Sequence, residues 1–352
     1  MLVGYAQVCN IEAKFNVRNS LPMPHHRLIA LVFSLSLLSG AASAGPEDCH
    51  LQKVAELAVR LDSGRPEVDG TLNGRPIRVA VSTGSSKTTL TEAAAERLGL
   101  EVTHLPMARV VLTPGRGLRE IGAVSVDNLT VGGWQADHLK LQVVAMGAGG
   151  VDLVLGQDVF SQADVELDFA HNAVRFFQAQ GCEGVPLAYW ADTYAEAGMQ
   201  YSQDPRRRFS NRVWVRLNGH EFLARLSTGT RYSTLSDTIA HQQGVYEGDP
   251  GVTKLAMIGP QESEKYPLSV GTFNSLAIGD ETLNNVKLRF TRFNPDFQSD
   301  VGRHAWGLIL GMDFIKSHRI FIANSQDKIY FTNVSRPIFD TQTPDTEVTP
   351  ER

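Results

Sequence analysis

Two identical tripeptides contain the residues of this sequence whose type and spacing could support chemistry. Ser82-Thr83-Gly84 and Ser227-Thr228-Gly229 lie 145 residues apart. A serine hydroxyl can hold a water molecule by hydrogen bonding, but it cannot accept the proton of that water near neutral pH. A serine acts as a nucleophile only beside a base that a third group orients. Lys87 is the nearest candidate base in the first segment, and Tyr232 stands at its equivalent in the second. A serine-nucleophile enzyme is therefore the minor hypothesis.

The other side chains that bind metals, nucleotides or nucleic acids do not occur in a suitable pattern. The ten histidines show no His-x-x-x-His or His/Cys spacing, and three cysteines cannot form a four-cysteine zinc site. The glycine-rich segment 147–150 precedes a strand-like run rather than a helix, unlike a nucleotide-binding loop. The net charge of -5 gives no basic face for nucleic acid. We expect no metal, no cofactor and no nucleic-acid partner.

The two tripeptides belong to longer segments that are repeated along the chain. Leu72-Asn73-Gly74 matches Leu217-Asn218-Gly219 at the same offset of 145 residues. Further on, the segment 153–160 (LVLGQDVF) matches 308–315 (LILGMDFI) at an offset of 155. The second copy therefore carries about ten extra residues, which we place in the polar stretch 294–304. This self-similarity indicates a tandem duplication.

Each copy is expected to be mostly β. Asn-Gly at 73–74 and at 218–219 predicts a hairpin turn. A short helix should follow each Ser-Thr-Gly, because Thr91 and Ser236 can cap its start and Gly99 and Gly244 can end it. Each copy then closes with a strand pair, 165–169 with 174–177 and 319–322 with 329–331.

The chain of 352 residues is long enough for two domains, which the duplication defines. We place the first repeat at 45–177, a linker at 178–211 and the second repeat at 212–332. The tail 333–352 is polar and contains proline, so we expect it to be disordered.

Residues 1–44 have the three-part layout of a secretory signal. His25-His26-Arg27 precedes the apolar run 28–38, and Ala42-Ser43-Ala44 offers small residues for cleavage after Ala44. The run is too short to cross the bilayer, so we expect a secreted or periplasmic protein with no membrane span. Cleavage removes Cys9 and leaves Cys49 and Cys182, which we expect to form a disulfide in an oxidising compartment.

The order of these elements resembles the retropepsin-like aspartic peptidases. The resemblance rests on the strand, Asn-Gly hairpin, X-Thr-Gly loop, short helix and Leu-x-Leu-Gly-x-Asp-x-Phe block, and it covers 66–177 and 212–332. It implies a mostly β fold, with two β-barrel halves related by a pseudo-twofold axis and a cleft between them. A chain that contains both halves need not dimerise, so we expect a monomer.

The resemblance also implies roles for individual residues. Ser82 and Ser227 take the positions of the two catalytic carboxylates and should face each other. Thr83 and Thr228 should reach across to the opposite loop, and Gly84 and Gly229 should let the chain turn. Asp158 and Asp313 belong to a supporting turn. The hairpins that form flaps over the cleft should have these residues near their tips: Pro114, Gly115 and Gly117 in the first copy, and Gly259 and Pro260 in the second.

The departure from the family lies in the dyad itself. In the family two aspartates share one proton, and one of them acts as general base on a water molecule. Two serines supply neither the base nor the shared proton. The sequence therefore predicts an exported protein that holds an extended peptide or an unfolded protein segment between its repeats without cutting it. The alternative, which the sequence leaves open, is an active aspartic endopeptidase.

Overall fold

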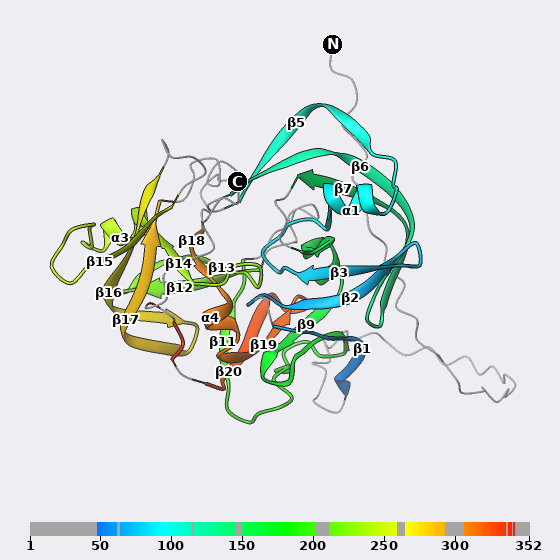
Figure 1. The fold of residues 1–352 in the computed structure, drawn as a ribbon. Coiled ribbons are helices and arrows are strands. Elements are labelled where there is room, and N and C mark those ends of the chain that lie inside the picture. The colour runs from blue at the N-terminus through cyan, green and yellow to red at the C-terminus, as the bar shows by residue number, and fades with distance from the viewer. Residues whose placement is uncertain are drawn as a thin grey trace, which may run out of the picture.

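The computed structural model describes residues 48–61, 64–113, 116–145, 150–200, 211–258, 265–292, 306–335, 337–339 and 341. The predicted signal segment 1–44 and the extra stretch 294–304 lie outside these residues. The described chain is mostly β and forms two barrels that stand on a shared sheet, drawn below them in Figure 1. The predicted two-barrel fold is confirmed.

The first repeat forms one seven-stranded sheet that closes on itself. Pairing of β2 with β6 closes a ring, and β5 extends from β6 outside that ring. Its strands are β2 (Glu67–Leu72), β3 (Arg75–Val81), β8 (Leu153–Leu155), β4 (Thr89–Thr91), β7 (Trp134–Ala145), β6 (Arg116–Val131) and β5 (Thr103–Thr113). Fully buried side chains such as Val79, Leu90 and Leu153 fill the interior.

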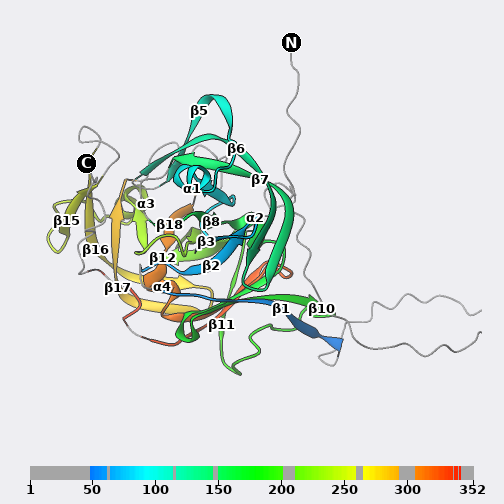
Figure 2. The same ribbon diagram turned by 45° about the vertical axis from the view of Figure 1, so that its right-hand side comes forward.

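The second repeat has the same arrangement, in which pairing of β12 with β16 closes the ring and β15 extends from β16. Its strands are β12 (Arg212–Leu217), β13 (His220–Leu226), β18 (Trp306–Leu310), β14 (Thr234–Ser236), β17 (Glu281–Thr291), β16 (Tyr266–Ile278) and β15 (Thr253–Ile258). In both views of the molecule, the β5–β6 hairpin projects from the first barrel on the side away from the shared sheet (Figures 1 and 2).

The local signals of the sequence account for the turns and helices of both barrels. Asn73 and Asn218 have φ angles of 50° and 49°, and the glycines after them are also left-handed, as a tight hairpin requires. Helix α1 (Glu92–Arg97) begins where the Thr91 hydroxyl accepts a hydrogen bond from the Ala94 amide, and α3 (Asp237–Gln242) begins at Ser236 in the same way. Two shorter helices, α2 (Gln157–Phe160) and α4 (Met312–Ile315), lie inside the repeated Leu-Gly-x-Asp blocks.

The shared sheet joins the two repeats. Its strand order is β1 (His50–Ala58), β10 (Ala173–Gln180), β9 (Asp164–Asp168), β19 (His318–Ala323), β20 (Lys328–Asn333) and β11 (Ala195–Gly198). The two central strands come from different repeats, and Leu167 pairs with Ile320 across them. A short 3-10 helix, η2 (Phe169–His171), links β9 to β10. The pseudo-twofold axis that relates the two repeats therefore passes between β9 and β19.

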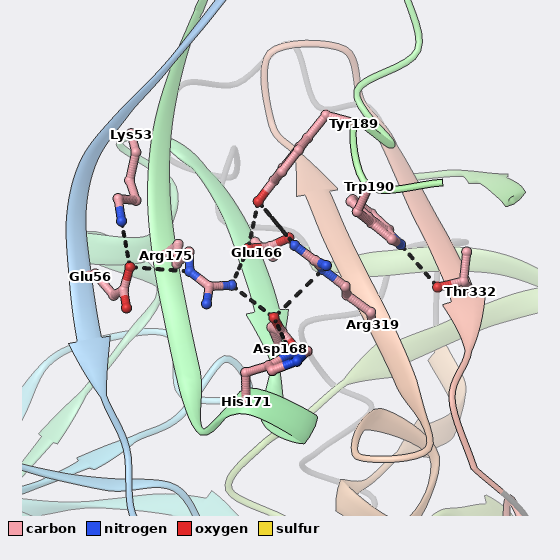
Figure 3. A network of polar contacts seen from close by, with 10 residues as sticks. All are labelled: Lys53, Glu56, Glu166, Asp168, His171, Arg175, Tyr189, Trp190, Arg319 and Thr332. Carbon is pink, nitrogen blue, oxygen red and sulfur yellow. Dashed lines mark hydrogen bonds and ion pairs between the residues drawn. The ribbon is translucent and has the colours of Figure 1, made fainter. Parts of the chain in front are cut away.

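One face of this sheet buries a network of charges (Figure 3). The side chains of Glu166 and Asp168 in β9 are 0% and 2% exposed. Arg175 Nη1 lies 2.7 Å from Glu166 and 2.8 Å from Asp168, and Arg319 Nη2 lies 2.7 Å from Glu166. The Tyr189 hydroxyl donates to the same glutamate at 3.0 Å. Residues from both repeats thus satisfy the buried carboxylates, as burial of charge requires.

The start of the first repeat and the segment between the repeats are tied to the shared sheet. Cys49 and Cys182 form the expected disulfide, which joins the start of β1 to the segment after β10. The segment 178–211, predicted as a linker, contributes β11 to the sheet edge. Sequence patterning missed both outer strands because neither carries a repeated motif.

The expectation that the whole tail 333–352 is disordered is wrong at its start. Ile338 is buried, and the ring of Phe339 stacks on Phe314 with 6.1 Å between centroids. Packing on the second repeat removes these two apolar side chains from water, which lowers their free energy. Among the described residues, no helix is long and apolar enough to cross a membrane.

Candidate functional site

The two Ser-Thr-Gly loops leave equivalent strands of the two barrels. Ser82 follows the end of β3, and its amide donates to Leu155 O in β8 at 3.0 Å. Ser227 follows β13, and its amide donates to Leu310 O in β18 at 2.9 Å. Each loop is therefore fixed at its root by the strand that carries the Leu-Gly-x-Asp block.

The two threonines lock the loops together in the reciprocal manner that the resemblance implies. The Thr83 amide donates to Thr228 Oγ1 at 3.0 Å, and the Thr228 amide donates to Thr83 Oγ1 at 3.1 Å. Each hydroxyl then donates to a carbonyl of the opposite barrel, Thr83 to Leu226 O at 3.1 Å and Thr228 to Val81 O at 2.6 Å. Both threonines are fully buried, so these bonds are shielded from water.

The glycines bring the two serines close to the opposite loop. A Cβ atom at Gly84 would lie 2.2 Å from Ser227 Oγ, and one at Gly229 would lie 2.5 Å from Ser82 Oγ and 4.0 Å from Ser227 Oγ. A side chain at either glycine would therefore collide with the other repeat's serine. Both serine hydroxyls lie within 4.0 Å of the position that a Cβ atom at Gly229 would take, and each serine is 6% exposed.

The hydroxyl pairs determine what chemistry the site can offer. Ser82 Oγ accepts a hydrogen bond from Ser85 Oγ at 2.9 Å, and Ser227 Oγ lies 2.9 Å from Thr230 Oγ1. These contacts run from hydroxyl to hydroxyl, so they can orient a bound polar group but cannot remove a proton from it near neutral pH. The partner of the Ser82 hydroxyl is the Ser85 hydroxyl, which cannot serve as the base of a serine nucleophile.

The candidate base position of the second repeat is occupied by an aromatic ring in a packing role. Tyr232 is 6% exposed, and the Arg289 guanidinium lies 3.7 Å from the centroid of its ring. Arg231 lies 5.3 Å from the same centroid. Cation–π contacts of this kind stabilise the loop after Ser227.

The repeated aspartates support the loops from beneath. Asp158 accepts hydrogen bonds from the Thr88 amide at 2.9 Å and the Thr88 hydroxyl at 2.7 Å. Asp313 accepts from the Ser233 amide at 2.9 Å and the Ser233 hydroxyl at 2.6 Å. Both carboxylates thus accept hydrogen bonds from the segment that follows each Ser-Thr-Gly, as a supporting role requires.

Three further side chains contact the first loop, and sequence reasoning missed them. Asn211, Gln157 and Arg225 donate to the carbonyls of Thr83 and Gly84. Burial lowers the pKa of Arg225 to about 10, and the neighbouring charge of Arg212 adds to this effect. The one sequence signal for them is a break in the repeat, because the equivalent positions hold Pro66, Met312 and Ala80.

The predicted flap residues are described only in part. Pro114, Gly115, Gly259 and Pro260 lie outside the described residues. Gly117 belongs to β6, where its backbone pairs with Leu112 of β5. In the part of the chain that the structure describes, no group of three or more His, Cys, Asp or Glu side chains is placed to hold a metal ion.

Similarity to known proteins was found with one family model and among solved structures. A family model described as aspartyl protease matches residues 68–159, which cover most of the first barrel. No curated protein matches the sequence. A structural search matches a retropepsin-like aspartic protease from Rickettsia conorii with 19% identity and a TM-score of 0.27, over 37% of this chain and 94% of the other.

The two closed barrels and the paired loops are the features that the resemblance to the retropepsin-like aspartic peptidases implies. The resemblance drawn from the repeated motifs is confirmed by the family match over the first repeat, and the second repeat forms the same closed ring of strands.

Proposed function

We propose that this chain is an exported protein that binds extended polypeptide at the paired Ser-Thr-Gly loops and does not hydrolyse it. The observation that carries the proposal is the pair of serine hydroxyls on the two paired loops, each within 4.0 Å of the Cβ position at Gly229 and each hydrogen-bonded to a further hydroxyl. A carboxylate dyad activates water because it can accept a proton, and hydroxyls lack this capacity.

The open sheet edges of the two barrels support binding of an extended chain. β5 and β15 are the terminal strands of their sheets. A terminal strand presents unpaired backbone groups along its outer edge, to which a bound peptide can add as a further strand. Recognition of this kind uses main-chain hydrogen bonds, so it suits unfolded segments of varied sequence.

The disulfide supports export. Cys49 and Cys182 are bonded, and disulfides persist in oxidising compartments such as the periplasm or the extracellular space. Mass spectrometry of the protein recovered from the exported fraction should give a chain that begins at Gly45. A protein that stays in the cytoplasm with the full N-terminal segment would contradict this part of the proposal.

The alternative is an active aspartic endopeptidase. Retention of the threonine lock and of both supporting aspartates favours it, because these contacts hold a dyad in place. The same contacts are compatible with a binding protein that keeps the loops rigid. The two functions differ in one measurable result, which is cleavage by the unchanged chain.

The test uses a fluorescein-labelled, reduced and carboxymethylated protein as the unfolded probe. Anisotropy measures its binding and gel electrophoresis its cleavage, from acid to neutral pH. We expect the unchanged chain to bind without cutting, and the double variant Ser82→Asp/Ser227→Asp to cut in acid. Ser86→Asp is the matched control, because Ser86 is exposed beside the first loop. Cleavage by the unchanged chain that Ser82→Ala abolishes would overturn the proposal.

A further inference from the structure

The loop of the first repeat is held by side-chain donors that contact its backbone carbonyls. Asn211 Nδ2 and Gln157 Nε2 each donate to Thr83 O at 2.6 Å. Arg225 Nη2 donates to the next carbonyl, Gly84 O. Arg225 belongs to the second repeat and Asn211 directly precedes it, so the first Ser-Thr-Gly loop is held by side chains from the second half of the chain.

The second loop cannot receive the same donors. Pro66 corresponds to Asn211, because Pro66 O accepts from the Val81 amide at 2.8 Å as Asn211 O accepts from the Leu226 amide at 3.1 Å. Ala80 corresponds to Arg225 on the equivalent strands β3 and β13, and Met312 corresponds to Gln157. Proline, alanine and methionine have no side-chain hydrogen-bond donor. The asymmetry is therefore built into the residue types.

Arg225 supplies the strongest of these contacts. A hydrogen bond from a charged donor is roughly twice as strong as one between neutral groups. Burial and the charge of Arg212, which faces Arg225 across β12 and β13, lower the pKa of Arg225 to about 10. The guanidinium nevertheless stays protonated at neutral pH, so the contact with Gly84 O is charge-assisted there.

Gly84 is the point at which this contact reaches the serines. A Cβ atom at Gly84 would lie 2.2 Å from Ser227 Oγ, so the Gly84 backbone is packed against the second serine. Displacement of Gly84 would change the gap between that serine and the first loop. It would also move Ser85, whose hydroxyl donates to Ser82 Oγ at 2.9 Å.

We propose that Arg225 is a positioning residue that fixes the Gly84-Ser85 segment, so that the first loop is the rigid half of the site and the second loop the yielding half. The effect on ligand affinity rests on the proposed function, because it assumes that extended polypeptide binds at these serines. The difference in rigidity between the loops does not rest on it.

Hydrogen exchange measures the rigidity without any ligand. In the unchanged chain, we expect the amides of 82–86 to exchange at least about tenfold more slowly than those of 227–231, since a charge-assisted bond must break for the first loop to open. Arg225→Met should raise exchange at 82–86 to the level of the second loop, and Arg225→Lys should restore part of the protection. Equal exchange of the two loops in the unchanged chain would overturn the proposal even if Arg225→Met fails to fold.

Arg212→Met is the matched control, because it removes the same charge from the facing strand and leaves the Gly84 contact in place. We expect it to leave exchange at 82–86 unchanged. An equal effect of Arg212→Met and Arg225→Met would refute a specific role for the Gly84 contact.

Binding of the carboxymethylated probe then tests the consequence for the site. Arg225→Met should weaken binding about tenfold while Arg225→Lys recovers part of it. Unchanged affinity in a folded Arg225→Met variant that has lost loop protection would refute the link between rigidity and binding. If the unchanged chain does not bind the probe, the proposed function fails, while the exchange result still decides the role of Arg225.

Discussion

Replacement of Arg175 by methionine tests how far the shared sheet depends on its buried charges. Arg175 Nη1 contacts Glu166 at 2.7 Å and Asp168 at 2.8 Å, while the arginine side chain itself is 17% exposed. Methionine matches the length of the arginine's aliphatic stem and keeps its apolar contacts, so the change removes the guanidinium with its charge and its hydrogen bonds.

The cost follows from the contacts that remain. Removal of one partner from a buried ion pair typically costs about 3–5 kcal/mol, because the other charge stays in a medium of low polarity. Glu166 keeps Arg319 at 2.7 Å and the Tyr189 hydroxyl at 3.0 Å, and Asp168 keeps His171 at 2.8 Å. We therefore expect a loss near the lower end of the range, about 3 kcal/mol.

Urea unfolding followed by circular dichroism measures this loss. Lys53→Met is the control, because Lys53 and Glu56 form an ion pair at 2.6 Å on the same sheet but are 51% and 40% exposed. An exposed pair contributes at most about 1 kcal/mol. The double variant Arg175→Met/Glu166→Gln should recover part of the loss, since it removes the stranded negative charge.

The same experiment has a predicted pH dependence. Burial alone would raise the pKa of Asp168, but hydrogen bonds from Arg175 and His171 and the charge of Arg319 outweigh it and hold this pKa below its usual value. A carboxylate with a lowered pKa stabilises the fold above its unfolded pKa, and this contribution is lost as the pH falls through the folded pKa. The difference in the free energy of unfolding between Arg175→Met and the unchanged chain should therefore become smaller below about pH 4. A difference in the free energy of unfolding of less than about 1 kcal/mol at neutral pH would refute the view that the buried carboxylates depend on Arg175.

Three other changes should have effects that the structure makes specific. Reduction of the Cys49–Cys182 bond, which spans 133 residues, should lower the free energy of unfolding by about 4–5 kcal/mol, and urea unfolding with and without reductant checks this. Thr83→Val leaves the buried Thr228 amide without its hydroxyl acceptor and should cost about 1–3 kcal/mol in the same assay, whereas Thr83→Ser should cost less. Burial raises the pKa of Tyr330 to about 12, so its contribution to stability should be lost as the pH rises from about 10 to about 12. Tyr330→Phe should make the alkaline fall in melting temperature less steep, and an unchanged slope would contradict this.

Local signals in the sequence predicted much of each barrel. The Asn-Gly pairs at 73–74 and 218–219 form the hairpins, because asparagine and glycine tolerate positive φ. Thr91 and Ser236 cap the helices that follow the two loops. Each of these features depends on a few neighbouring residues, so a single sequence is enough to recognise it.

The shared sheet could not be predicted in the same way. Strand β11 is formed by Ala195–Gly198, a segment of four small or charged residues that is too short to show a strand period, and it exists because β20 offers it an edge. The burial of Ile338 could not be predicted for a similar reason, because it depends on a surface that other parts of the chain form. Pairing between distant segments leaves no local period in the sequence.

The sequence by itself determined that this chain contains an internal repeat and that serine is the first residue of both Ser-Thr-Gly loops. These are facts of residue type and spacing, and they exclude a carboxylate base at 82 and 227. Only the tertiary structure decided how unequal the two loops are. Asn211 and Arg225 lie over 120 residues from the Thr83 and Gly84 carbonyls that they hold, and folding of the two barrels against each other brings them together.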